Sequence, residues 1–124
     1  MVDQRMEKLA KLIVNYSTAV KPGDKVWIRG EAGGAPLMME VYKQVLKAGG
    51  LPHITSELDE MKPALLKYGS SEQLAYMPAA VKNLFETSDV MIVIRAEQNT
   101  HALSSASPQA MVQWSRGRAE TQGI

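Results

Sequence analysis

The alternation of apolar and polar positions divides the chain into helices and strands. Apolar residues at steps of three and four predict amphipathic helices over residues 3–20 and 36–48. Three shorter segments, residues 25–29, 52–58 and 90–94, predict strands. The last of these is an unbroken apolar run, which is typical of a strand buried on both faces of a parallel sheet.

Further helical patterns follow the second strand, interrupted by turns. A short helix is expected at residues 61–66, and another begins at Pro78. Between them, Ser70 and Gln73 have the spacing of a capping box, in which each side chain satisfies a free backbone N–H group. A last helix is expected over residues 107–114.

With a helix after every strand, this order predicts a small three-layer α/β domain: a parallel sheet built from βαβ units, with residues 1–124 forming a single domain. One feature conflicts with a sheet this small. In a 2-1-3 strand order, residues 90–94 would lie at the edge, although their composition is that of an internal strand. Because an open apolar edge invites pairing, we expect the chain to be the front part of a larger sheet, or another subunit to cover this strand.

Composition excludes several classes of function. The 124 residues contain 14 Lys and Arg against 13 Asp and Glu, a net charge of +1 that gives no reason to expect nucleic acid. Cysteine is absent, which excludes disulfides and thiolate metal sites. No strand-like apolar stretch approaches the roughly 20 residues that span a membrane, and the N-terminus is charged where a signal peptide is apolar. We therefore expect a soluble, cytoplasmic protein without a membrane partner.

Candidate site residues follow the first and third strands. Ligands of open α/β sheets bind outside the carboxyl ends of strands, near the point where strand order reverses. Arg29 and Glu31 lie at one such end, and Arg95, Glu97 and Asn99 at another. Two guanidinium groups there could hold a carboxylate or phosphate, or meet a neighbouring domain. The alternative is that each arginine pairs with a neighbouring glutamate at the rim of the sheet.

Other chemistry has little support. The glycines at 30, 33 and 34 do not reproduce a dinucleotide or P-loop motif, so a tight turn is favoured over nucleotide binding. The two histidines, His53 and His101, belong to no recognisable metal motif. We therefore predict no catalytic residue and no metal ligand in this chain.

Five segments carry a resemblance to a known family: residues 6–17, 20–26, 46–50, 71–74 and 94–100, the last reading IRAEQNT. In this order and register they resemble the N-terminal domain of the M29-type, thermophilic metallo-aminopeptidases of the aminopeptidase T group. The similarity runs from about residue 3 to residue 114, so it is more specific than any single motif.

The resemblance implies an α/β domain of a homodimeric exopeptidase that releases N-terminal amino acids from peptides. Family members hold two divalent ions, zinc or cobalt, with carboxylates and histidines of a separate C-terminal domain. None of those positions lies in the matched segment, which implies that this chain has no cofactor of its own. The missing catalytic domain would be its partner, and peptide would be a substrate only of the full-length enzyme. From the residues alone, a free-standing module that binds a small anion or self-assembles stays an alternative, and whether this chain is an enzyme is open.

Overall fold

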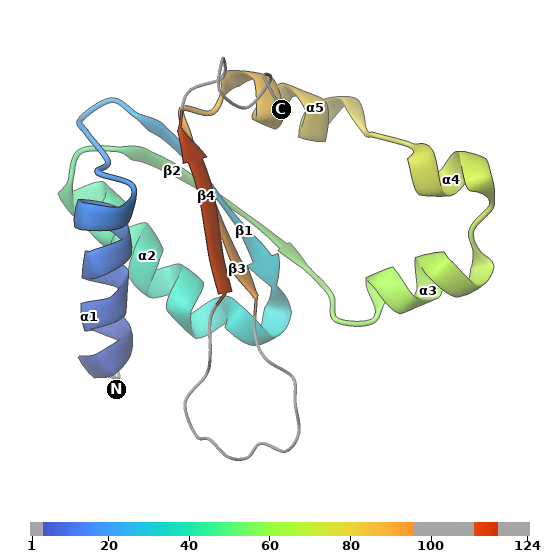
Figure 1. The fold of residues 1–124 in the computed structure, drawn as a ribbon, viewed down its shortest axis with the longest axis horizontal. Helices are drawn as coiled ribbons and strands as arrows, with labels where there is room; N and C mark the ends of the chain where they lie inside the picture. Colours follow the sequence, from blue (N-terminus) through green and yellow to red (C-terminus); the bar gives the residue numbers. More distant parts are fainter. Residues whose placement is uncertain (1–3, 96–110, 117–124) are drawn as a thin grey trace.

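A four-stranded sheet in the order β2-β1-β3-β4 forms the centre of the computed structural model, which describes residues 4–95 and 111–116 (Figure 1). The three strands β1, β2 and β3 run parallel, and β4 runs antiparallel to β3. Their bounds are Lys25–Glu31, Leu51–Glu57, Val90–Arg95 and Met111–Arg116. The strand with mixed composition, β2, lies at the edge, as its polar residues predict.

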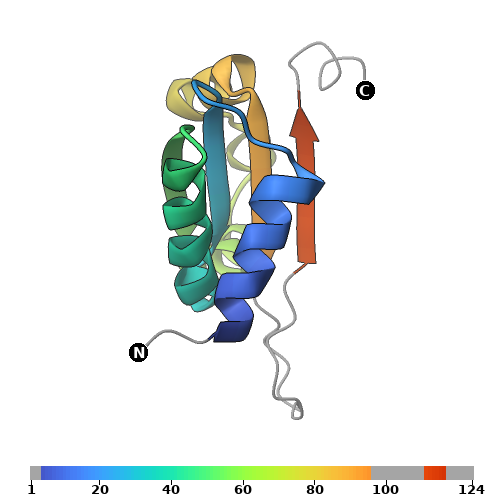
Figure 2. The ribbon, with the colours of Figure 1, turned by 90° about the vertical axis from the view of Figure 1, so that its left-hand side faces the viewer.

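A mostly parallel sheet with helices packed on it confirms the α/β class (Figures 1 and 2). The helices α1 and α2 pack together on one face, whereas α3 and α4 extend away from the sheet and α5 reaches its other face through Phe85, which contacts Trp27. The bounds are Gln4–Leu12, Ala35–Lys47, Met61–Tyr68, Ser71–Ala75 and Ala79–Thr87. A π-helical turn, Ile13–Ser17, extends α1, and a 3-10 turn, Ala32–Gly34, precedes α2. Within the described ranges, no helix has the length and apolar character needed to cross a membrane.

The hydrophobic core lies between the sheet and the layer of α1 and α2. Val26 and Ile28 of β1 alternate with residues that face the other side, and the same alternation holds in β3. Burial of these side chains is the main stabilising contribution to the fold. The core residues, all at most 5% exposed, are Ala10, Ile13, Val14, Val26, Ile28, Leu37, Met38, Val41, Val45, Val90, Ile92 and Ile94.

Hydrogen bonds from side chains define several element ends. The buried Thr18 hydroxyl donates to the carbonyl oxygen of Ile13 at 3.0 Å and lies 3.3 Å from that of Val14, and the left-handed backbone of Ala19 (φ 50°) ends the first helix earlier than its pattern predicts. The predicted capping box is confirmed: the backbone N–H of Gln73 donates to Ser70 Oγ at 3.2 Å, and the backbone N–H of Ser70 donates to Gln73 Oε1 at 2.9 Å. The helix predicted at Pro78 is also confirmed, with that residue at the N-cap of α5.

A reciprocal pair of hydrogen bonds joins the beginnings of β1 and β3. The Lys25 N–H donates to Asp89 Oδ2 at 2.9 Å, and the Asp89 N–H donates to the Lys25 carbonyl oxygen at 2.8 Å. Because these bonds join the first residue of β1 to the residue just before β3, they fix the register of the two strands, in which Ile28 lies beside Ile92.

The predicted last helix is wrong where the structure describes it, because Met111–Arg116 is the strand β4. Val112 and Trp114 alternate with Gln113, a period of two that competes with the helical spacing, and pairing with β3 satisfies the backbone groups of both strands. Consequently β3 is internal, as its composition predicts, and its cover comes from this chain rather than from another subunit. Self-association through an open edge of β3 is excluded for the same reason.

Candidate functional site

The strand order reverses between β1 and β3. From β1 the chain crosses through α2 to β2, then returns past β1 through α3 to α5 and enters β3 on the other side. Because β1 and β3 are parallel, their carboxyl ends lie at the same edge of the sheet. A crevice outside this switch point is where open α/β sheets commonly bind ligands.

A pocket of about 310 Å³ lies at this edge, on the face that carries α3 to α5. It brings together three of the four predicted site residues, Arg29, Glu31 and Arg95, whereas Asn99 lies outside the described residues. Two charged residues that the sequence analysis did not select, Glu57 and Lys62, also line it. Met91 and Val93 of β3 contribute apolar side chains, and the pocket is completed by Gly30 and Ile94.

The Arg29 side chain is held by two aromatic rings. Its guanidinium carbon lies 4.6 Å from the centre of the Trp27 ring and 5.5 Å from that of Phe85. The two rings meet edge to face, with centroids 4.9 Å apart at 85°, and Trp27 Nε1 donates a hydrogen bond to Thr55 Oγ1 at 3.0 Å. Cation–π contacts of this kind leave the N–H groups at the rim of the guanidinium plane available to an acceptor.

None of the five charged side chains that line the pocket forms an ion pair with another described residue. The expected alternative, in which Arg29 pairs with Glu31, is therefore not what the described part of the chain shows. The corresponding partner of Arg95 would be Glu97, which lies outside the described residues. The pocket thus contains three cationic side chains and two carboxylates, none of which is paired with another described residue.

The two carboxylates belong to neighbouring strand ends. Glu31 of β1 and Glu57 of β2 are direct register partners, and like charges in that position repel each other. Sequence reasoning could have found Glu57, since the last residue of any parallel strand lies at the same edge as Arg29. Lys62 could have been found in the same way, because it stands in the first turn of the helix that leaves that edge.

The glycine-rich loop after β1 has a packing role. A Cβ atom on Gly30 would collide with the carbonyl oxygen of Ile94 and would lie 3.0 Å from Met38 Sδ. The missing side chain therefore allows β1 to lie close to β3 beneath α2. This accounts for Gly30 without a phosphate ligand and agrees with the tight turn that the sequence favours.

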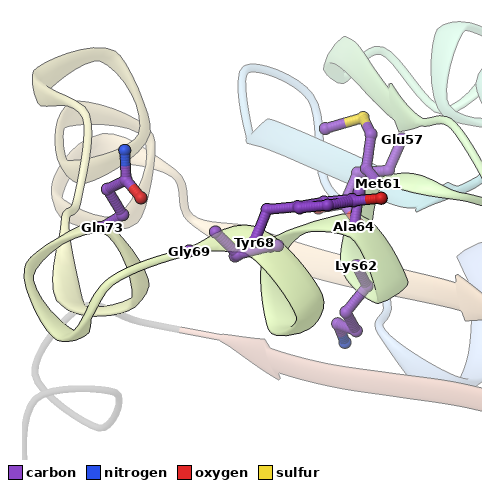
Figure 3. A pocket seen from close by; sticks show the side chains of 8 residues that line it. Glu57, Met61, Lys62, Ala64, Tyr68, Gly69 and Gln73 are labelled. Carbon is purple, nitrogen blue, oxygen red and sulfur yellow. The ribbon is translucent and has the colours of Figure 1, made fainter.

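A second, larger pocket adjoins the first through shared residues. Its volume is about 620 Å³, and Glu57 and Lys62 line both pockets (Figure 3). Most of its other lining is apolar, from Met61, Ala64 and Leu65 of α3 together with the ring of Tyr68. In Figure 3 the Lys62 side chain points away from Met61, so the two lie on different sides of α3. A charged pocket and an apolar pocket therefore lie side by side.

No group of three or more His, Asp or Glu side chains that could hold a metal ion occurs among residues 4–95 and 111–116. His53 is an exposed residue of β2, and His101 lies outside the described residues. The residues present therefore do not fit a two-metal centre, because the pocket offers only the carboxylates of Glu31 and Glu57.

The fold and this pocket define an α/β domain of the doubly wound type with a ligand-sized crevice at its switch point. Comparison with known families then gives a specific assignment. The sequence model of the thermophilic metalloprotease family, M29, matches residues 2–124, and the chain belongs to this family. The resemblance found in the sequence is thus confirmed.

One solved structure shows how the chain relates in length to a larger protein. Wild-type AmpT from Thermus thermophilus is similar with a TM-score of 0.57 and 18% sequence identity, over 67% of this chain and 21% of that one. The likeness shows a shared fold. The chain therefore spans about a fifth of the length of this relative. A search of curated proteins found no significant match.

Proposed function

We propose that this chain is the N-terminal domain of a metal-dependent aminopeptidase that releases N-terminal amino acids from peptides, and that the domain is inactive alone. The observation that carries the proposal is the family match over residues 2–124, in a chain that spans 21% of AmpT. The catalytic residues would then lie in a separate, C-terminal domain.

The metal chemistry of the proposal is assigned to that other domain. A metal pair requires several carboxylate or imidazole ligands, and residues 4–95 and 111–116 contain no such group. The zinc or cobalt pair implied by the resemblance would polarise the peptide carbonyl and supply hydroxide within the catalytic domain. In this proposal the present domain contributes a wall of the substrate cleft, with Arg29, Glu31 and Arg95 on the face toward it.

An exposed apolar surface supports a partner for this domain. Large apolar side chains of α3, of the turn before it and of the turn after α4 are at least half exposed, whereas monomeric proteins rarely leave a large contiguous apolar patch uncovered. We assign this surface to contact with the catalytic domain, and the complete enzyme to a cytoplasmic homo-oligomer. The residues of this apolar surface, which lie outside the two pockets, are Leu58 (68% exposed), Leu66 (67%), Tyr76 (72%) and Met77 (50%).

Hydrolysis assays test the inactive part of the proposal. The purified chain, supplied with Zn²⁺ or Co²⁺, is expected to release no nitroaniline from leucine p-nitroanilide, whereas full-length AmpT under the same conditions serves as the positive control. Release that a chelator abolishes, and that persists after a further purification step, would show that the isolated domain is an enzyme after all.

The DNA beyond the Ile124 codon tests the domain assignment. We expect the reading frame to continue into a segment with Glu, His and Asp residues spaced as metal ligands. A stop codon directly after Ile124 would refute the assignment to a larger enzyme. Sedimentation velocity of the resulting full-length product then tests the homo-oligomer, which a single monomeric species at all concentrations would contradict.

A further inference from the structure

We propose that the pocket at the switch point binds the zwitterion of an α-amino acid or short peptide with an apolar side chain. The carboxylate would lie against Arg29 and Arg95, and the ammonium against Glu31 and Glu57. This assignment rests on the charges, packing and dimensions of the described residues. It concerns binding without hydrolysis, so it goes beyond the proposed aminopeptidase function.

The cationic side of the pocket is suited to a carboxylate. Arg29 is half-buried, and its guanidinium lies against Trp27 and Phe85, at 4.6 and 5.5 Å from the ring centres. The two ring contacts hold the guanidinium in place, and its N–H groups have no acceptor among the described residues. An oriented guanidinium loses little side-chain entropy when it binds, and its planar fork matches the two oxygens of a carboxylate.

The acidic side of the pocket is suited to an ammonium group. Glu31 and Glu57 are adjacent in the β1–β2 register and repel each other, and no described cation lies within ion-pair distance of either. A ligand ammonium has three N–H donors, so it can bond to both carboxylates at once and relieve the repulsion. A simple anion would instead be repelled by both carboxylates, which favours a zwitterion over phosphate or a plain carboxylate.

The position and size of the two pockets indicate an apolar side chain. The charged pocket, at about 310 Å³, is at the lower end of the range of small-molecule sites, as a ligand of few atoms requires. The apolar pocket of about 620 Å³ shares Glu57 and Lys62 with it. A ligand whose charged backbone lies in the first pocket can therefore place an apolar side chain, or a second apolar residue, in the other.

The ligand series that tests the proposal consists of leucine, leucinamide, N-acetyl-leucine and leucyl-leucine, titrated calorimetrically into the 124-residue chain. Leucinamide lacks the carboxylate and N-acetyl-leucine lacks the ammonium, so each is expected to bind at least about tenfold more weakly than leucine. Tighter binding of leucyl-leucine than of leucine would identify a short peptide as the source of the zwitterion, and the reverse order would identify a free amino acid.

Two substitutions test which residues bind the carboxylate and which bind the ammonium of the ligand. Arg29→Gln is expected to weaken the binding of leucine at least about tenfold. The affinity for leucinamide should change little, since that ligand has no carboxylate to contact Arg29. Glu57→Gln is expected to weaken the binding of leucine but not that of N-acetyl-leucine, which has no ammonium group. The matched control Lys11→Gln removes one positive charge from an exposed position on α1, on the opposite face, and should leave all affinities unchanged. Circular dichroism and the melting temperature of each variant verify that the fold is kept.

Three results would overturn the proposal. The first is the absence of binding by leucine and leucyl-leucine at millimolar concentration. The second is equal affinity for leucine and either of its blocked derivatives, which needs no variant protein. The third is tighter binding of leucine by the Glu57→Gln variant, the result expected of a plain anion site. None of these results depends on a metal or on hydrolysis. A failure of the binding proposal therefore leaves the proposed aminopeptidase function intact, and a failure of that function would leave the binding proposal intact.

Discussion

The two faces of one sheet differ sharply in this domain. On the side of α1 and α2, alternate residues of β1 and β3 are at most 1% exposed and form a continuous apolar core. On the opposite side, the intervening residues include the charged Arg29, Glu31 and Arg95, and the helices α3, α4 and α5 contain no buried residue. Because strand side chains alternate, one β-strand supplies the core with half of its residues and the candidate site with the other half.

This difference predicts that stability resides on one face and binding on the other. A truncation in the core should cost several kcal/mol, since it removes buried apolar surface and leaves a cavity. An equal truncation on α3 or α4 should cost little, because its side chains are already exposed to water. The following substitutions probe this contrast, from the largest expected effect to the smallest.

The largest effect is expected from Ile92→Ala. Ile92 is fully buried in the centre of β3. Its truncation should lower the free energy of unfolding by about 3–4 kcal/mol, measured by urea denaturation followed by circular dichroism. The milder Ile92→Val should cost about 1 kcal/mol and shows whether the loss scales with volume. If the alanine variant lost less than about 1 kcal/mol of unfolding free energy, the core on this face would not be tightly packed.

The second effect concerns the close approach of β1 and β3. A Cβ on Gly30 would collide with the backbone carbonyl of Ile94, which cannot move without displacing β3. Gly30→Ala should therefore destabilise the domain by about 1–3 kcal/mol in the same assay. The exposed Gly33 provides the matched control, and equal costs for both alanine variants would show that strand spacing is not the cause.

The third effect should stay local to α4. Ser70→Ala removes the acceptor for the Gln73 amide and should weaken this helix start by about 1 kcal/mol. Hydrogen exchange at the Gln73 amide should accelerate several-fold, while global unfolding should change little because α4 contains no buried residue. Ser71→Ala, at the next position, is the control. A large drop in global stability would contradict the view that this layer is loosely held.

The smallest effect on stability is expected from Leu66→Ser on the exposed apolar surface. Leu66 is 67% exposed, so the free energy of unfolding should stay within about 0.5 kcal/mol of the wild-type value. Sedimentation of the isolated domain should at the same time show less association, if this surface mediates contact. Strong destabilisation would instead place Leu66 among the residues that hold the fold together.

Much of the parallel sheet and its helices could be predicted from local patterns. The run at 90–94, the helix beginning near Pro36 and the Ser70–Gln73 capping box each depend on neighbours in sequence, and the structure contains all three. The last segment could not be predicted in that way. Whether residues 111–116 are helical or extended depends on pairing with β3, which the local pattern does not encode.

The candidate site was predictable in part for a related reason. Arg29, Glu31 and Arg95 are found by counting to the ends of parallel strands, which is a matter of topology. The aromatic contact of Arg29 with Phe85 depends on how α5 packs on the sheet, and no spacing in the sequence indicates it. This contact is thus determined by the packing of α5 on the sheet, which the periodicity of the sequence does not indicate.

The reciprocal bonds between Lys25 and Asp89 also bear on the order in which the domain folds. They join residues 64 positions apart, and they belong to β1, the first strand in sequence and an inner strand in space. A ribosome must therefore release most of the chain before β1 can pair with its second neighbour, β3. Closing such a long loop is costly before its contacts form, so we expect sheet assembly, rather than helix formation, to limit the rate of folding.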